Sequence, residues 1–149
     1  MLVDVVTEIE IERPRGVVAS YASEPGNATA WYQNIKAAVS KTPGPVLAGS
    51  RIAFTAVFLG RRLTYTYEVS EFVPGERLVM RTSEGPFPME TMYAWRDARP
   101  GATLMTLRNR GEPSGLSGLA APVVARSMRS ANRKDLARLK AILEADGAQ

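Results

Sequence analysis

The sequence contains neither cysteine nor histidine. Without cysteine, the chain forms no disulfide bond and offers no thiolate as a nucleophile or as a zinc ligand. Without histidine, it lacks the commonest metal ligand and the usual general base near neutral pH. Hydrolysis by a Ser-His-Asp triad is therefore excluded. We expect no metal and no cofactor, and any acid–base chemistry has to come from carboxylates, tyrosines, lysines, arginines or bound water.

Long hydrophobic runs are missing as well. The apolar runs are far shorter than the roughly 18 residues that cross a membrane as a helix. The N-terminal segment does not resemble a signal peptide, because its apolar residues are interrupted by Asp4, Glu8, Glu10 and Glu12. We therefore predict a cytoplasmic protein without a membrane span.

The chain is long enough for one well-packed domain. Its 149 residues, 45% of them hydrophobic, predict a single domain over residues 1–149 with a sizeable core. The net charge is +4, and much of the positive charge comes late, at Arg126, Arg129, Arg133, Lys134, Arg138 and Lys140. Clustered cations can indicate contact with nucleic acid or a membrane. Here they lie on a predicted amphipathic helix, so we interpret them as its solvent-facing side and expect no nucleic-acid partner.

Alternating apolar and polar residues predict a strand over residues 2–12. Pro14 then opens a short helix, and a second short helix follows at residues 28–32. Further strand candidates lie at residues 35–41, 51–59, 89–96 and 103–109, and in the two runs of residues 63–82 that flank a turn at residues 73–76. Turns rather than helices join these segments, which favours an antiparallel sheet of about seven strands.

A long helix is predicted after the glycine- and serine-rich residues 111–118. Apolar residues recur there at spacings near three and four, at Leu119, Val123, Val124, Met128, Ala131, Leu136, Leu139 and Leu143. This order of elements predicts an α+β fold in which a curved antiparallel sheet wraps around the helix. A helix is only about 10 Å wide, whereas seven strands spaced about 4.8 Å apart are much wider. We therefore expect a cavity between the helix and the sheet.

Alternation also assigns one face of each strand to the helix. The inward rows are Ile52, Phe54, Ala56 and Phe58; Leu63, Tyr65, Tyr67 and Val69; Leu78, Met80 and Thr82; Met89, Thr91, Tyr93 and Trp95; and Thr103, Met105, Leu107 and Asn109. A purely structural core prefers Leu, Ile, Val and Phe. Tyrosine, threonine and methionine are instead frequent in these rows, which is typical of a small-molecule cavity.

The candidate ligand-binding residues are Phe54, Tyr65, Tyr67, Met80, Tyr93, Trp95, Met105, Leu107, Val124 and Met128. The three tyrosines are favoured because they add hydroxyl groups to the inward rows. Core packing is the favoured alternative for Phe54 and Trp95, and the methionines serve equally well as gap fillers. Trp31 and Tyr32 either cap the mouth of the cavity or join the second short helix to the long helix.

No catalytic residue is assigned from these rows. The carboxylates of Glu68, Glu71 and Glu90 alternate outward, and Arg108 reaches inside only if its strand register is shifted. An inward carboxylate would be a candidate general base. Because the rows contain none, the sequence favours ligand binding over catalysis.

Several passages occur in a characteristic order along the chain: residues 9–18, Trp31, Pro43–Pro45 with Gly49–Arg51, residues 67–78, Gly101–Thr103, and the helix ending at residues 136–144. In this order they resemble the START-like superfamily (SRPBCC), which includes the Bet v 1 allergens, and especially its bacterial polyketide cyclase/dehydrase-like branch. The resemblance covers nearly the whole chain. It implies a helix-grip fold, with two short helices after the first strand and a long C-terminal helix.

The resemblance implies that a small hydrophobic molecule, aromatic, polyketide-like or lipid-like, binds between the sheet and the C-terminal helix. The alternative is a cyclase/dehydrase-like enzyme, in which Tyr65, Tyr67 and Tyr93 polarise carbonyl groups during aldol closure and dehydration. A reading of another class is nucleic-acid or protein-partner binding through the basic surface. Self-association as a homodimer stays open.

Overall fold

The computed structural model describes residues 3–58, 60–85, 87–112 and 121–147. Its strands are β1 (Val3–Ile11), β2 (Ile35–Ser40), β3 (Arg51–Phe58), β4 (Arg61–Val73), β5 (Arg77–Glu84), β6 (Met89–Arg99) and β7 (Ala102–Gly111). They form one sheet in the order β1-β7-β6-β5-β4-β3-β2, and every neighbouring pair is antiparallel. The predicted antiparallel sheet is therefore confirmed.

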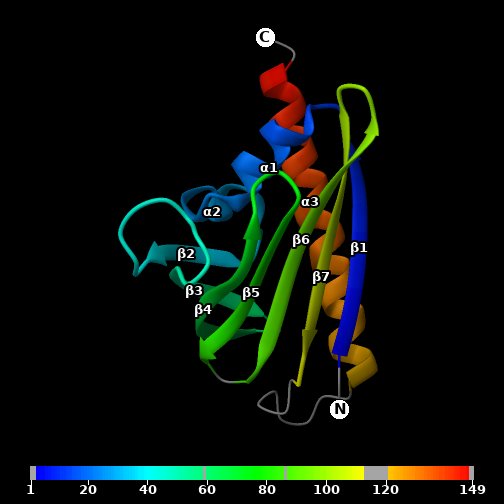
Figure 1. Cartoon of the computed structure of the whole chain (residues 1–149). Helices are drawn as coiled ribbons and strands as arrows, with labels where there is room; N and C mark the ends of the chain where they lie inside the picture. Colours follow the sequence, from blue (N-terminus) through cyan, green and yellow to red (C-terminus); the bar gives the residue numbers. More distant parts are fainter. Residues whose placement is uncertain (1–2, 59, 86, 113–120, 148–149) are drawn as a thin grey trace.

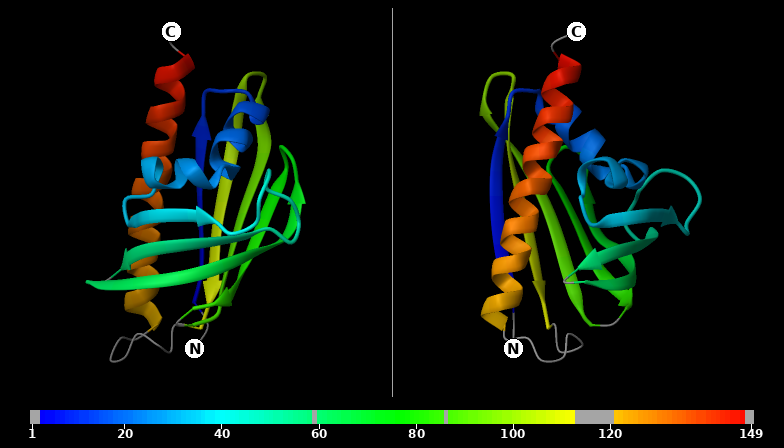
Figure 2. Two further views of the ribbon diagram at one scale, coloured as in Figure 1. Left: turned by 90° about the vertical axis from the view of Figure 1, so that its left-hand side faces the viewer. Right: turned by 180° about the vertical axis from the view of Figure 1, so that it is seen from behind.

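The helices lie on one side of this sheet. They are α1 (Arg15–Ser23), the 3₁₀ turn η1 (Pro25–Asn27), α2 (Ala28–Trp31) and α3 (Ala121–Gly147). The first three connect β1 at one edge of the sheet to β2 at the other edge (Figure 1). Helix α3 runs along the concave side beside β1, while α1 and α2 lie near its C-terminal half (Figure 2). This is the α+β helix-grip arrangement that the sequence predicts.

Strand β4 ends in a tight turn and contains two bulges that bend the sheet. The turn into β5 closes with a hydrogen bond of 2.9 Å from the Glu76 N–H to the Val73 carbonyl, and Gly75 adopts a positive φ of 78° there. A left-handed residue after proline is typical of a type II turn, which requires glycine at that position. The register of β4 against β5 also shifts twice, between Thr66 and Tyr67 and between Val69 and Glu71. Such bulges bend and twist a strand.

The predicted inward rows face the helices. In β7, for example, Thr103, Met105, Leu107 and Asn109 are buried, and the residues between them are partly exposed. The side chain of Phe58 lies outside the described part of the chain. On the opposite face Glu90 accepts hydrogen bonds from Arg81 and Arg110, and Arg108 pairs with Asp4. Arg108 therefore points outward, and no register shift brings it inside.

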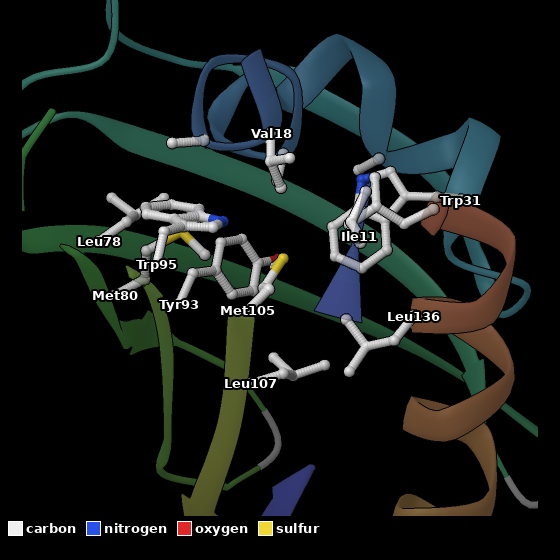
Figure 3. Close-up of a cluster of buried hydrophobic side chains, with 14 of the residues drawn as sticks. Ile11, Val18, Trp31, Leu78, Met80, Tyr93, Trp95, Met105, Leu107 and Leu136 are labelled. Atoms are coloured by element: carbon white, nitrogen blue, oxygen red, sulfur yellow. The ribbon is translucent and has the colours of Figure 1, made fainter. Parts of the chain in front are cut away.

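Two apolar clusters form the core. The larger one lies beneath α1 and α2 and reaches the C-terminal half of α3 through Leu136, Leu139 and Leu143 (Figure 3). The smaller one surrounds Val124 near the start of α3 and consists of Val3, Val5, Leu63, Tyr65, Phe87 and Val124. Polar contacts hold the C-terminal half of α3 in place: Arg13 donates to the Leu143 carbonyl at 2.7 Å, and Lys140 donates to the Glu10 carbonyl at 2.8 Å.

One residue of the predicted apolar stripe does not face the core. The side chain of Val123 is 49% exposed, whereas Val124 is buried. The periodicity of 3.6 residues per turn explains the difference, because Val124 lies four residues before Met128 on the inner face and Val123 lies outside that line. Leu119 belongs to residues 113–120, which lie outside the described part. No helix in the described residues is long and apolar enough to cross a membrane.

Candidate functional site

A cavity of about 140 Å³ lies between the sheet and the first half of α3. Its walls come from strands across the sheet, from the segment between α2 and β2, and from one face of α3. They consist of Val3, Tyr32, Asn34, Ile35, Ala56, Leu63, Tyr65, Tyr67, Phe87, Met89, Asn109, Val124, Met128, Ala131, Asn132 and Asp135. Most of the lining is apolar, with a few polar groups at defined places, which is the usual composition of a small-molecule pocket.

Aromatic rings from β4 form one wall. The ring centres of Tyr65 and Tyr67 are 6.0 Å apart, and Phe87 packs edge-on against Tyr65 at 5.7 Å. Thr91, which lies beside Tyr67, donates its hydroxyl to the side-chain oxygen of Asn109 at 2.8 Å. Burial raises the pKa values of Tyr65 and Tyr67, so both phenols stay neutral and keep their protons near neutral pH.

Asp135 provides a buried carboxylate at the helix wall. It is 3% exposed, and its Oδ1 accepts a hydrogen bond of 2.9 Å from the backbone N–H of Gln33. Burial raises its pKa from 3.8 to about 6, although the hydrogen bond from Gln33 acts in the opposite direction. A carboxyl group with this pKa exchanges protons close to neutral pH, which is the property that an acid–base catalyst needs.

Asn132 lies one turn before Asp135 on the same face of α3. Its side chain is 6% exposed, and its amide nitrogen has no hydrogen-bond partner among the described residues. An unsatisfied buried amide costs free energy, roughly 1–3 kcal/mol. It is therefore a donor suited to an oxygen atom of a bound molecule.

A pair of hydroxyl groups lies close to these two residues. The hydroxyl oxygens of Tyr32 and Tyr93 are 2.5 Å apart, and both side chains are neutral because burial raises their pKa values. Tyr32 lines the cavity, whereas Tyr93 is not among the residues that line it. The Tyr32 hydroxyl, the Asn132 amide and the Asp135 carboxyl together make one end of the cavity polar.

The inward carboxylate was missed at the sequence level. The strand rows contain none, as predicted, but α3, which those rows do not include, contributes the buried Asp135 to the cavity. A signal was present: residues 131, 135 and 139 follow at intervals of four, so Asp135 shares the inner face with Ala131 and Leu139. The cations around it, which lie on the solvent-facing side, hide this signal in the sequence.

The ten predicted ligand-binding residues separate into two groups. Four line the cavity, namely Tyr65, Tyr67, Val124 and Met128. The other six, Phe54, Met80, Tyr93, Trp95, Met105 and Leu107, face inward but belong to the larger apolar cluster. Figure 3 shows Met80, Tyr93, Trp95, Met105 and Leu107 packed beneath the first short helix. The reason is physical: α1 and α2 fill that part of the concave face, so these six residues do not line the cavity.

The neighbouring residues Trp31 and Tyr32 also lie in different parts of the structure. Trp31 is fully buried in the larger cluster, with its ring centre 5.8 Å from that of Tyr93. Tyr32 lines the cavity and contacts Trp31 at a ring distance of 4.0 Å. One residue thus anchors the short helix, and the next one forms part of the cavity wall.

A curved antiparallel sheet that holds a long C-terminal helix, with a cavity between them, defines a helix-grip protein. The chain belongs to the family described as polyketide cyclase/dehydrase and lipid transport, whose sequence profile matches residues 3–144. No curated protein is significantly similar to the chain in sequence.

Solved structures share this fold at low sequence identity. The protein TTHA0849 from Thermus thermophilus is 20% identical with a TM-score of 0.81, over 96% of this chain and 98% of that one. A START superfamily protein from Mycobacterium smegmatis is 14% identical with a TM-score of 0.82, over 95% and 97% of the two chains. The Zhui aromatase/cyclase from Streptomyces sp. R1128 is 14% identical with a TM-score of 0.77, over 97% and 94%.

Proposed function

We propose that this protein binds a small, mainly apolar molecule that carries an oxygen atom, in the cavity between α3 and the sheet. The observation that carries the proposal is the group of polar side chains that α3 contributes to a mainly apolar cavity. There, the amide of Asn132 has no partner among the described residues, and the carboxyl group of Asp135 is buried beside it. Such an arrangement orients a ligand through a few polar contacts, while apolar contact supplies most of the affinity.

The size of the cavity limits the buried part of the ligand. A closed apolar cavity of roughly 150 Å³ is known to hold one benzene molecule. The cavity here is about 140 Å³, which suits one aromatic ring or a short branched chain. A larger aromatic, polyketide-like or lipid-like molecule extends from it toward the surface.

The test is a thermal-shift screen of the purified protein, followed by calorimetry. The series runs from toluene and p-cresol through 1-naphthol to quinones, flavonoids and fatty acids. We expect saturable binding, with p-cresol tighter than toluene because its hydroxyl reaches the polar end. An Asn132→Leu variant should lose the preference for p-cresol and still bind toluene. If no compound binds to the folded protein, the proposal is wrong.

Two further variants examine the aromatic wall. Tyr65→Phe and Tyr67→Phe each remove one hydroxyl and leave the ring, so we expect weaker binding of hydroxylated ligands. The free energy of unfolding should change by less than about 1.5 kcal/mol, the usual contribution of one hydrogen bond. Unchanged affinity in both variants, measured by calorimetry, would show that the hydroxyls of β4 do not contact the ligand.

A second candidate function is supported by Asp135. The Zhui protein is an aromatase/cyclase, and cyclisation of a poly-β-ketone starts with removal of a proton next to a carbonyl group. Asp135 has a pKa suited to that step, and the Asn132 amide and the Tyr32 hydroxyl, which line the same cavity, are donors of the kind that stabilise an enolate oxygen.

This candidate predicts turnover as well as binding. Incubation with a poly-β-ketone thioester should give a product that has lost water, detected by mass spectrometry, and Asp135→Asn should abolish it. The value of kcat/KM should rise as the pH passes about 6, because the ionised carboxylate is the base. Binding without any turnover would leave the protein as a carrier.

A further inference from the structure

Helix α3 carries most of the net positive charge of the molecule. Residues Ala121–Gly147 contain six basic and three acidic side chains. On the outer face of the sheet, by contrast, Arg108 pairs with Asp4 at 2.6 Å. On α3, Arg126 and Lys134 form no ion pair with any residue that the structure describes. They therefore present uncompensated charge.

These two cations lie at one groove, between α3 and the segment that joins α2 to β2. The groove is lined by Arg126, Ser127, Ser130 and Lys134 from the helix and by Gln33 and Asn34 from that segment. We call it the cationic groove. Ser130 follows Arg126 by four residues and precedes Lys134 by four, so the three side chains are neighbours on one helix face. Its lining contains no acidic residue.

The cationic groove adjoins the cavity. Asn34 and Ala131 line both of them. A second cleft, lined in part by Lys134, Asp135 and Arg138, shares Tyr32 and Asp135 with the cavity and Gln33 and Lys134 with the cationic groove. An anion in that second cleft would face the ionised carboxylate of Asp135. The cationic groove has no such repulsion, so it is the better place for a negative group.

We propose that the ligand is an anionic amphiphile, with its apolar body in the cavity and a carboxylate or phosphate group in the cationic groove. This inference rests on the proposed binding function and specifies the ligand class. A guanidinium, an ammonium and hydroxyl groups are the donors that form strong hydrogen bonds with an oxyanion. The groove is at the surface, so the anion keeps part of its hydration and avoids the large cost of full burial.

The experiment compares ligands that differ only in the terminal group: 4-phenylbutanol, 4-phenylbutyrate and 4-phenylbutyl phosphate. Affinities are measured by calorimetry at pH 8 and about 0.15 M salt, where screening acts beyond roughly 8 Å. We expect the two anions to bind about tenfold more tightly than the alcohol, because charged hydrogen bonds are stronger than neutral ones. The ratio of the affinities for the carboxylate and the phosphate then shows which oxyanion the groove prefers.

The chain offers a matched control for charge. Arg126→Gln with Lys134→Gln should reduce the preference for the anions to less than about threefold. Arg129→Gln with Arg133→Gln removes the same charge from the same helix, but neither residue lines the groove, so the preference should persist. All four side chains lie at least partly in solvent, and both double variants should fold.

Two results would overturn the inference alone: an alcohol that binds as tightly as the acid, or equal losses in the two double variants. The proposed binding function would survive either result, since the alcohol still binds. If neither the alcohol nor the anions bind, the proposed function fails, and the ligand class fails with it.

Discussion

Asp135 shows how burial and hydrogen bonding compete at one residue. Burial opposes its ionisation, while the Gln33 N–H favours the carboxylate, and burial has the larger effect. The result is a carboxyl group that folding makes less acidic. In a purely structural protein an apolar residue would pack better at this place. The carboxyl group, with its raised pKa, is the kind of group that an acid–base catalyst uses, which is why it supports the second candidate function.

This gives a prediction about stability and pH. Between the ordinary pKa of 3.8 and the folded value of about 6, the folded protein binds more protons at Asp135 than the unfolded chain does. Ionisation therefore destabilises the fold as the pH rises through this range. Asp135→Asn removes that cost, and the side-chain oxygen of the new asparagine can still accept the hydrogen bond from the Gln33 N–H. We expect the variant to match the wild type near pH 4 and to be up to about 3 kcal/mol more stable at pH 8.

Urea unfolding at pH 4, 6 and 8 measures this difference. Tyr32 and Tyr93 do not titrate in this range, because burial raises their pKa values. Asp146→Asn, at an exposed position on the same helix, serves as the control and should show little change. If Asp135→Asn differs from the wild type by the same amount at every pH, the carboxylate is not disfavoured by burial.

At the scale of elements, α3 has three functions on three parts of its surface. Leu136, Leu139 and Leu143 close the larger cluster. The face with Asn132 and Asp135 forms the cavity wall, and the remaining side carries the cations. A residue at each part should respond differently to substitution.

Leu139→Ala should destabilise the protein by about 2–5 kcal/mol, because the side chain is fully buried and its removal leaves a void. Val123→Ala is the matched control on the same helix. Its side chain is 49% exposed, so we expect a change within about 0.5 kcal/mol. Chemical denaturation of both variants checks the prediction, and similar values for the two would contradict the assignment of the inner face.

The fold could be predicted from the sequence because short-range patterns determine it. Alternation in β4 and β7 and the Pro74-Gly75 turn fix strands, register and faces. The site was only partly predictable. Alternation tells which face a residue such as Met105 takes, but not whether a helix or a cavity covers it. Asp135 was hidden for another reason, since a helix rich in charges disguises one inward carboxylate unless its position on the helix face is examined.

At the scale of the whole molecule, the cavity follows from how the helices cover the sheet. Helices α1 and α2 pack over the part of the concave face next to the end of α3, and residues such as Trp31 fill it. The other part is covered by the first half of α3 and by the segment that follows α2, and the cavity lies there. The molecule thus combines a well-packed half that stabilises the fold with a half that contains the cavity.

The most direct test of ligand binding in this cavity is to fill it. Ala131 lines the cavity, and Ala137 is an exposed position on the same helix. In two separate variants each of these alanines is replaced by leucine, a residue that also favours the helix. Calorimetric titration with p-cresol should show that Ala131→Leu weakens binding about tenfold or more, because the added side chain occupies space that the ligand needs, whereas Ala137→Leu binds like the wild type. Equal affinity in the two variants would show that the ligand binds elsewhere and would contradict the proposed site.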